Sequence, residues 1–234
     1  MTQQKNQCTQ AENGRVPRIL VVTAVDAERD AVLRGLDGDT NFTVIAGGVG
    51  PATAAVSAAL ELAASPSYEL VISAGIGGGF SGAAELGTLV LADAVIAADL
   101  GAETAEGFIP LDELGFGTAS LPVSEAWRER LHGIIRQSGL PLHIGPVLTV
   151  STVTGTAETA ELRAELVPGA AAEAMEGYGV AQAAAKLEVP FAELRSISNA
   201  VGPRDRAAWR IGDAMQALEN AFSAIRFIAK EMDQ

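Results

Sequence analysis

The sequence predicts a single-domain α/β protein with three layers, in which a largely parallel mixed central sheet lies between two layers of helices. Apolar, β-branched runs typical of buried strands alternate along the chain with alanine-rich or amphipathic segments typical of helices. This alternation favours parallel strands joined by right-handed crossovers. The 234 residues are 48% hydrophobic and 5% aromatic without a break in composition, so one core is the simplest arrangement.

The composition also limits the partners that the protein can have. Residues 1–16 are polar and aperiodic, so we expect a flexible tail followed by one domain over residues 17–234. A net charge of -13 disfavours nucleic acid and membrane surfaces as partners and leaves a small molecule. Cys8 is the single cysteine and no apolar leader or membrane span is recognisable, so we expect a cytoplasmic protein. His132 and His143 have no metal-ligand spacing, and we predict neither a metal nor a cofactor.

The first part of the chain has two strand-to-helix units. Strands are expected at residues 19–22 and 42–45, and helices at residues 26–33 and 52–63. Glu28 falls in the first turn of the first helix, just past a strand end. Gly48 and Gly50 precede Pro51 at the start of the second helix, an N-terminus that suits water or an anion.

A glycine-rich stretch follows the next apolar run. Val71 to Ala74 indicate a strand, and Gly75 to Gly79 contain four glycines in five positions, which predicts a turn of bare backbone against which a flat ring can lie. A tight turn would explain any single glycine but is a poorer account of all four. Residues 77–82 formally match a dinucleotide fingerprint, but only residues 83–86 are available for the crossover helix that it requires, so we reject that site.

The rest of the chain continues the alternation. Residues 101–117 form a long excursion of the kind that often acts as a lid, and Ser124 is expected to cap the helix after it. We expect strands at residues 87–96, 142–150 and 191–198, helices at residues 124–135, 158–166, 171–187 and 211–228, and a polar loop at residues 199–206.

Several chemically useful groups follow predicted strands and can share one rim of the sheet. They are Glu28, Gly47 to Gly50, Gly75 to Gly79, Thr152 to Gly155 and Asn199. With Glu176 they offer two acids and an amide, and no serine, cysteine and histidine arrangement suits acyl transfer. Each group alone has a structural explanation, as a helix-end acid, a solvated acid or a turn cap.

Taken together, four segments resemble the nucleoside phosphorylase superfamily, and its bacterial nucleosidase branch, which includes methylthioadenosine/S-adenosylhomocysteine nucleosidase, is the nearer relative. The segments are Thr23-Ala24-Val25-Asp26-Ala27-Glu28, Ser73-Ala74-Gly75-Ile76-Gly77-Gly78, Ala174-Met175-Glu176-Gly177 and Arg195-Ser196-Ile197-Ser198-Asn199. Within that branch, residues 101–104, 111–117, 175–177 and 199–209 resemble the futalosine hydrolase family. The resemblance covers the chain from about Arg18 to the C-terminus.

The resemblance implies a nucleoside phosphorylase-like fold, a homo-oligomer built on dimers, and a role for each motif. Glu28 would activate the attacking water, and Met175 and Glu176 would hold the ribose. The purine would lie against Ala74, Gly75, Ile76 and Gly77. Asn199 stands where the adenine-specific relatives have aspartate, and an amide can donate to a 6-oxo group while it accepts from a protonated N7. The implied reaction is hydrolysis of a 6-oxopurine nucleoside, namely futalosine to hypoxanthine and dehypoxanthine futalosine in menaquinone biosynthesis.

Other functions stay open from the sequence. A purine nucleoside phosphorylase would use the Gly47 to Gly50 helix start for phosphate, but the loop from Thr23 to Glu28 supplies an acid, which repels phosphate and suits water. An adenine-type nucleosidase and a non-catalytic nucleoside-binding protein are the remaining alternatives.

Overall fold

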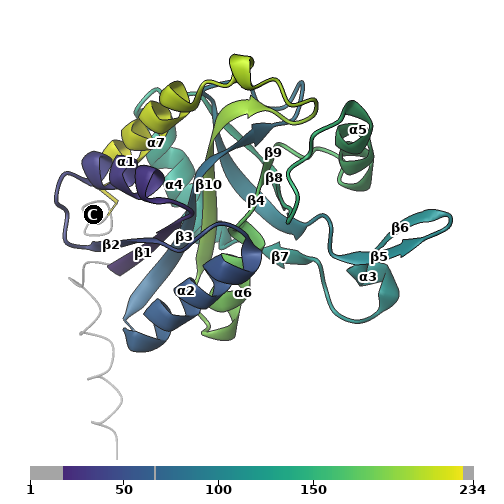
Figure 1. Cartoon of the computed structure of the whole chain (residues 1–234). Helices are drawn as coiled ribbons and strands as arrows, with labels where there is room; N and C mark the ends of the chain where they lie inside the picture. The colour runs from purple at the N-terminus through teal and green to yellow at the C-terminus, as the bar shows by residue number, and fades with distance from the viewer. Residues whose placement is uncertain (1–17, 66, 229–234) are drawn as a thin grey trace, which may run out of the picture.

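The computed structural model describes residues 18–65 and 67–228, so the predicted tail at residues 1–16 lies outside the described part. Figure 1 shows helices on both faces of a central sheet, as the sequence predicts. Successive side chains of a strand point to opposite faces of the sheet, so each strand contributes to the packing of both helical layers. Ile19 and Val21 pack with one layer, whereas Leu20 and Val22 pack with the other.

The described residues form an eight-stranded mixed sheet with the order β10-β4-β8-β9-β3-β1-β2, in which β7 pairs with β4. The strands are β1 (Arg18–Thr23), β2 (Phe42–Ala46), β3 (Tyr68–Gly79), β4 (Leu89–Ala97), β7 (Ser120–Pro122), β8 (Leu142–Thr149), β9 (Ala172–Ala174) and β10 (Phe191–Ala200). The predicted largely parallel, mixed sheet is confirmed, since β1–β2, β1–β3, β3–β10, β4–β8 and β8–β9 are parallel. In addition, β10 pairs with both β3 and β4, so part of the sheet closes on itself, which the sequence did not predict.

Two groups of helices cover the sheet. One face carries α1 (Asp26–Leu36), α4 (Glu125–Gln137) and α7 (Ile211–Ile225), and the other carries α2 (Pro51–Ala64) and α6 (Gly177–Lys186). The short α5 (Ala157–Leu166) lies near β8 and β9 (Figure 1). The helices α2 and α6 approach closely because Gly179 has no side chain, and a Cβ there would lie 1.9 Å from the Pro51 carbonyl oxygen.

The predicted excursion is a hairpin arm. It consists of β5 (Gly101–Thr104), β6 (Gly107–Pro110) and the one-turn α3 (Leu111–Leu114), and Figure 1 shows it projecting from the body of the domain. Among the described residues, no helix has both the length and the apolar character needed to cross a bilayer.

Four local predictions were wrong. Gly75 to Gly79 do not form a turn but belong to β3, because β10 and β9 pair with them. Residues 172–174 form β9 rather than the start of a helix, because β8 and β3 flank them. Asn199 lies inside β10 rather than in a loop, and Ser124 occupies the N-cap of α4 without a side-chain capping hydrogen bond.

Candidate active site

A cavity of about 290 Å³ lies at the carboxyl ends of β1, β3 and β10. The predicted site residues that line it are Glu28, Ile76, Gly77, Met175, Glu176 and Asn199. They come from segments up to 171 positions apart (199 − 28), so the fold brings together what the sequence only places in order. This volume is near the lower end of what small-molecule sites offer.

The other predicted site residues, Gly48, Gly50, Ala74 and Gly75, do not line the cavity. Ala74 is fully buried in the hydrophobic core. Gly75 packs against the side chains of Glu28 and Arg195. Gly48 and Gly50 have φ values of 93° and 91°, a conformation that favours glycine, and Val49 between them lines the cavity.

Glu28 is held in place by three backbone N–H groups. Its Oε2 accepts hydrogen bonds from the nitrogens of Ala24 (2.9 Å) and Val25 (3.2 Å), and its Oε1 accepts one from Ile76 (2.9 Å). Glu28 is the N3 residue of α1, and its carboxylate caps the start of the helix, as expected for an acid at a helix end. Glu28 also lines the cavity, although only 3% of its surface is exposed. Its carboxylate can therefore cap the helix and take part in catalysis at the same time.

A buried arginine connects the acids of the site. Arg195, only 1% exposed, places its Nε 2.8 Å from Glu193 Oε1 and its Nη1 3.3 Å from Glu176 Oε2, and it donates from Nη2 to Ser73 Oγ at 2.9 Å. Burial alone would lower the pKa of Arg195, but the carboxylates of Glu193, Glu176 and Glu28 raise it above its ordinary value. Arg195 therefore stays charged and holds Glu176 in position.

Glu193 is the second part of this network that the sequence analysis missed. Burial raises the pKa of its carboxyl group, and the neighbouring Arg195 opposes that shift. A signal was present in the sequence, because Glu193 and Arg195 are two residues apart in one strand and so share one face. Two charges on the same buried face have to pair.

The side chain of Asn199 lies next to Gly78 on the neighbouring strand β3. Its Oδ1 accepts a hydrogen bond from Ser198 Oγ (2.8 Å), and its Nδ2 donates to the carbonyl oxygen of Ala200 (2.9 Å). A Cβ on Gly78 would lie 3.2 Å from Asn199 Nδ2, so the glycine leaves room for the amide.

The wall opposite Asn199 contains a further polar cluster. Glu173 accepts from the Thr154 nitrogen at 2.8 Å and from the Thr154 hydroxyl at 2.5 Å, and Arg163 Nε lies 3.5 Å from its carboxylate. Glu173, Gly78 and Asn199 are aligned across β9, β3 and β10, so Glu173 and Asn199 flank the glycine. These contacts fix the loop after β8, which carries Val153 and Thr154 of the cavity wall.

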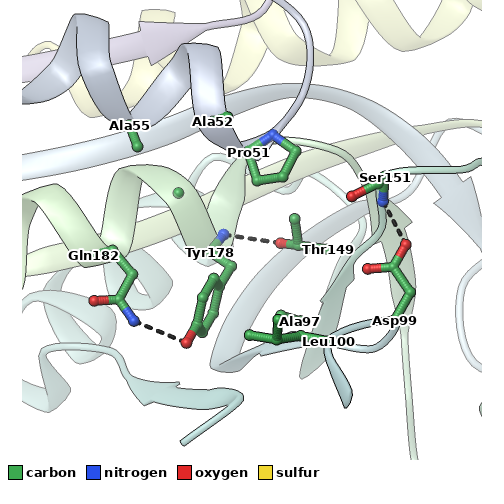
Figure 2. Close-up of a pocket in the computed structure, with 11 residues that line it drawn as sticks. Pro51, Ala52, Ala55, Ala97, Asp99, Leu100, Thr149, Ser151, Tyr178 and Gln182 are labelled. Atoms are coloured by element: carbon green, nitrogen blue, oxygen red, sulfur yellow. Dashed lines mark hydrogen bonds between the residues drawn. The ribbon is translucent and has the colours of Figure 1, made fainter. Parts of the chain in front are cut away.

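A second cavity of about 310 Å³ lies beside α2 and α6 (Figure 2). Tyr178 lines it, with its hydroxyl accepting from Gln182 Nε2 (2.8 Å) and its backbone nitrogen donating to Thr149 Oγ1 (2.8 Å). Asp99, an acidic residue that lines this cavity, accepts a hydrogen bond from the Ser151 backbone nitrogen at 2.6 Å. None of the predicted site residues lines this cavity, so the first cavity is the candidate active site.

Comparison with known proteins agrees with this geometry. Residues 17–230 match the family model described as the phosphorylase superfamily. The futalosine hydrolase of Streptomyces coelicolor is 51% identical, with 87% of this chain and 92% of the relative covered. The chain belongs to the futalosine hydrolase family of the phosphorylase superfamily.

Other members of the futalosine hydrolase family are also similar. The futalosine hydrolase of Acidothermus cellulolyticus is 47% identical over 88% of this chain and 89% of its own. Among solved structures, the 5′-methylthioadenosine/S-adenosylhomocysteine nucleosidase of Neisseria meningitidis has a TM-score of 0.77 at 18% identity, covering 92% of this chain and all of that one. This structural match shows the fold of the chain.

Proposed function

We propose that the chain hydrolyses the N-glycosidic bond of a 6-oxopurine nucleoside, and that this nucleoside is futalosine, which yields hypoxanthine and dehypoxanthine futalosine in menaquinone biosynthesis. The observation that carries the proposal is the placement of Glu28, Glu176 and Asn199 in one cavity of a chain that is 51% identical to a futalosine hydrolase. The three groups match the three parts of the reaction, namely the water, the sugar and the leaving base.

In this mechanism Glu28 is the general base. Cleavage passes through an oxocarbenium-like ribosyl state, and a carboxylate that removes a proton from water supplies the nucleophile. Three backbone N–H groups orient the Glu28 oxygens, so little reorganisation is required when water is bound. The carboxylate also stabilises the positive charge that develops on the sugar.

The contacts of Glu176 favour hydrolysis over phosphorolysis. In the phosphorylase alternative the start of α2 would bind phosphate, but the Gly50 nitrogen at this helix start already donates to Glu176 Oε1 at 3.2 Å. Arg195 is completely buried and is already bound to Glu193 and Glu176, so it is not available to an incoming phosphate. A negatively charged Glu176 at that helix start repels phosphate and accepts hydrogen bonds from the ribose hydroxyls.

Met175 and Asn199 complete the binding of the nucleoside. Met175 lines the cavity beside Glu176 and packs against the sugar, while the base lies on the backbone of Ile76 and Gly77. To read the base, Asn199 exchanges its contact with Ala200 for O6 and N7 of the purine. Its amide nitrogen donates to O6, and its carbonyl oxygen accepts from N7 when that atom is protonated.

The decisive experiment is incubation of the protein with futalosine, inosine and adenosine, each with and without phosphate, while the released base is measured. Hypoxanthine formed without phosphate supports the proposal. Release that depends on phosphate identifies a phosphorylase, a preference for adenosine identifies an adenine-type nucleosidase, and binding without release identifies a nucleoside-binding protein.

We also infer a homodimer or a higher homo-oligomer formed by the domain of residues 17–234. Val56 and Leu60 on α2 are 61% and 67% exposed, and the second cavity lies beside the same helix. Light scattering by the intact protein tests this inference. A cytoplasmic location, the lack of a cofactor or metal, and the lack of nucleic-acid partners stay predictions.

A further inference from the structure

A buried carboxylate behind the candidate active site has no part in the proposed reaction. Glu193 is fully buried and does not line the cavity. Its Oε1 accepts from Arg195 Nε at 2.8 Å, whereas its Oε2 has no hydrogen-bond partner among the residues that the structure describes. A buried carboxylate with an unpaired oxygen is costly to the fold. Packing alone therefore does not explain why a charged side chain is present at this position.

The chain leaves space for the Glu193 carboxylate. A Cβ on Gly177 would overlap it, so only a glycine fits beside Glu193 in its present position. Gly177 is the first residue of α6 and directly follows Glu176. The buried carboxylate of Glu193 therefore lies against the backbone that carries the proposed ribose-binding residue.

Arg195 directs each nitrogen of its guanidinium to a different residue. Its Nε donates to Glu193 Oε1 at 2.8 Å, its Nη2 donates to Ser73 Oγ at 2.9 Å, and its Nη1 lies 3.3 Å from Glu176 Oε2. Because a guanidinium is planar and rigid, the contacts of Nε and Nη2 fix the direction in which Nη1 points. Glu193 and Ser73 therefore set the distance between Arg195 and Glu176.

The contact between Arg195 and Glu176 is the longest of these three. Hydrogen bonds from a guanidinium to a carboxylate are usually about 2.7 to 2.9 Å long, so the 3.3 Å contact leaves much of the hydrogen-bonding capacity of Glu176 Oε2 unused. The other oxygen, Oε1, accepts from the Gly50 nitrogen at 3.2 Å. A carboxylate oxygen can accept two hydrogen bonds, so acceptor positions remain on Glu176 for the ribose hydroxyls.

We propose that Glu193 is a positioning residue for the binding of the ribose. Together with Ser73 it holds the Arg195 guanidinium at a distance from Glu176, so that the oxygens of Glu176 stay available to the ribose hydroxyls. The inference rests on the proposed function, in which Glu176 binds the ribose. Glu193 does not line the cavity and acts only through Arg195.

Without the charge of Glu193, the guanidinium of Arg195 would be drawn towards the acids of the cavity. A neutral amide in place of the carboxylate would keep a hydrogen bond to Nε, but with only about half of its strength. The guanidinium would then approach Glu176 and occupy the acceptor positions that the ribose requires. Glu28 would be affected less, because three backbone N–H groups hold its oxygens.

The test compares two ligands that differ in one ribose hydroxyl. They are 9-deazainosine and its 2′-deoxy analogue, in which a carbon atom replaces N9, so that the bond to the sugar is not hydrolysed. Their dissociation constants are measured by calorimetry with the unaltered protein and with Glu193→Gln. We expect the unaltered protein to bind the ribose ligand about tenfold more tightly, and Glu193→Gln to lower that ratio by about three- to tenfold. A purely structural role of Glu193 would weaken the binding of both ligands alike and leave the ratio unchanged.

Three further variants separate the positioning role from a general loss of structure. Ser73→Ala removes the other anchor of the guanidinium and should lower the ratio by about two- to threefold. In a Glu176→Gln background, Glu193→Gln should change the ratio no further, since it acts through Glu176. Ser196→Ala is the matched control, because this buried serine of β10 donates to the Ala214 carbonyl oxygen in α7 at 2.8 Å, and it should keep the original ratio.

An equal affinity of the unaltered protein for the two ligands, or a ratio that Glu193→Gln does not change, overturns the inference. If Glu193→Gln does not fold, an unchanged ratio in Ser73→Ala overturns it instead. The hydrolysis of inosine by the unaltered protein is measured separately. If inosine is not cleaved but the ratio depends on Glu193, the proposed reaction is wrong and the positioning role stands. If inosine is cleaved and the ratio is insensitive to Glu193, the reverse holds.

Discussion

Replacing Glu28 with glutamine should nearly abolish hydrolysis. The amide cannot take a proton from water, and loss of a positioned general base typically lowers the rate by roughly 10²- to 10⁴-fold, which is about 3 to 5.5 kcal/mol in the barrier. The structure indicates that the substitution also lowers the stability of the fold. Whichever way the amide is turned, its NH₂ group faces at least one of the N–H groups that now bind the carboxylate, at Ile76 or at Ala24 and Val25.

The cheaper orientation places the NH₂ group against the Ile76 nitrogen and sacrifices one hydrogen bond. A buried donor left unpaired costs about 1 to 3 kcal/mol of the free energy of unfolding. The variant should therefore remain folded but unfold at a lower temperature. Asp30→Asn is the matched control, since it removes the same charge from the same helix at an exposed position where Asp30 pairs with Arg29. It should leave both rate and stability nearly unchanged.

The assay is the release of hypoxanthine from inosine or futalosine, with thermal unfolding measured in the same buffer. Glu28→Ala adds a further test, because formate from solution can enter the vacated space and act as the missing carboxylate. If folded Glu28→Gln keeps more than about a tenth of the original rate, which is a loss of less than about 1.4 kcal/mol, Glu28 is not the general base.

Three further predictions concern the base, the sugar and the packing of the domain. Asn199→Asp should shift the ratio of kcat/KM for inosine over adenosine towards adenosine by about 10- to 100-fold, because a mismatched buried polar pair costs about 1 to 3 kcal/mol, and an unchanged ratio would exclude Asn199 from reading the base. Glu176→Gln should reduce the preference for inosine over 2′-deoxyinosine, since a charge-assisted hydrogen bond becomes a neutral one, and wild-type protein that cleaves both equally would contradict a ribose role. Gly179→Ala should lower the free energy of unfolding by about 2 kcal/mol or more, because its Cβ would clash with Pro51. Gly133→Ala in α4, where a Cβ meets nothing within 4 Å, should raise it by about 0.5 to 1 kcal/mol, and equal effects in the two variants would refute the packing argument.

The parts of the fold that could be predicted are those with a local cause. The strand at Ile19 to Val22 and the helix after it follow from apolar runs and an acidic first turn, so they were found within a few residues. The strand β9 could not be found, because its alanines favour a helix and only its neighbours β8 and β3 impose an extended backbone. Tertiary pairing overrides a weak local preference in such a segment.

The same distinction applies to the candidate site. Glu28, Glu176 and Asn199 stood out because each belongs to a recognisable short segment, whereas the partners of Arg195 depend on which strands lie side by side. The position of Asn199 also depends on an irregularity in β10, where the register with β3 shifts between Ile197 and Asn199. No pattern in the sequence alone predicts that shift.

The glycines of β3 also have a structural purpose that the sequence does not suggest. We expect them to present bare backbone to a flat ring, and in addition the space into which a Cβ of each would project is filled by groups of the protein. A Cβ on Gly75 would lie 2.6 Å from Glu28 Oε1, one on Gly77 would lie 2.9 Å from the Glu173 carbonyl oxygen, and one on Gly78 would lie 3.2 Å from Asn199 Nδ2. A Cβ would force these neighbours to shift, so each glycine permits its neighbours to approach the strand closely. Glu28, Glu173 and Asn199 can therefore surround one small cavity because β3 lacks side chains at these three positions.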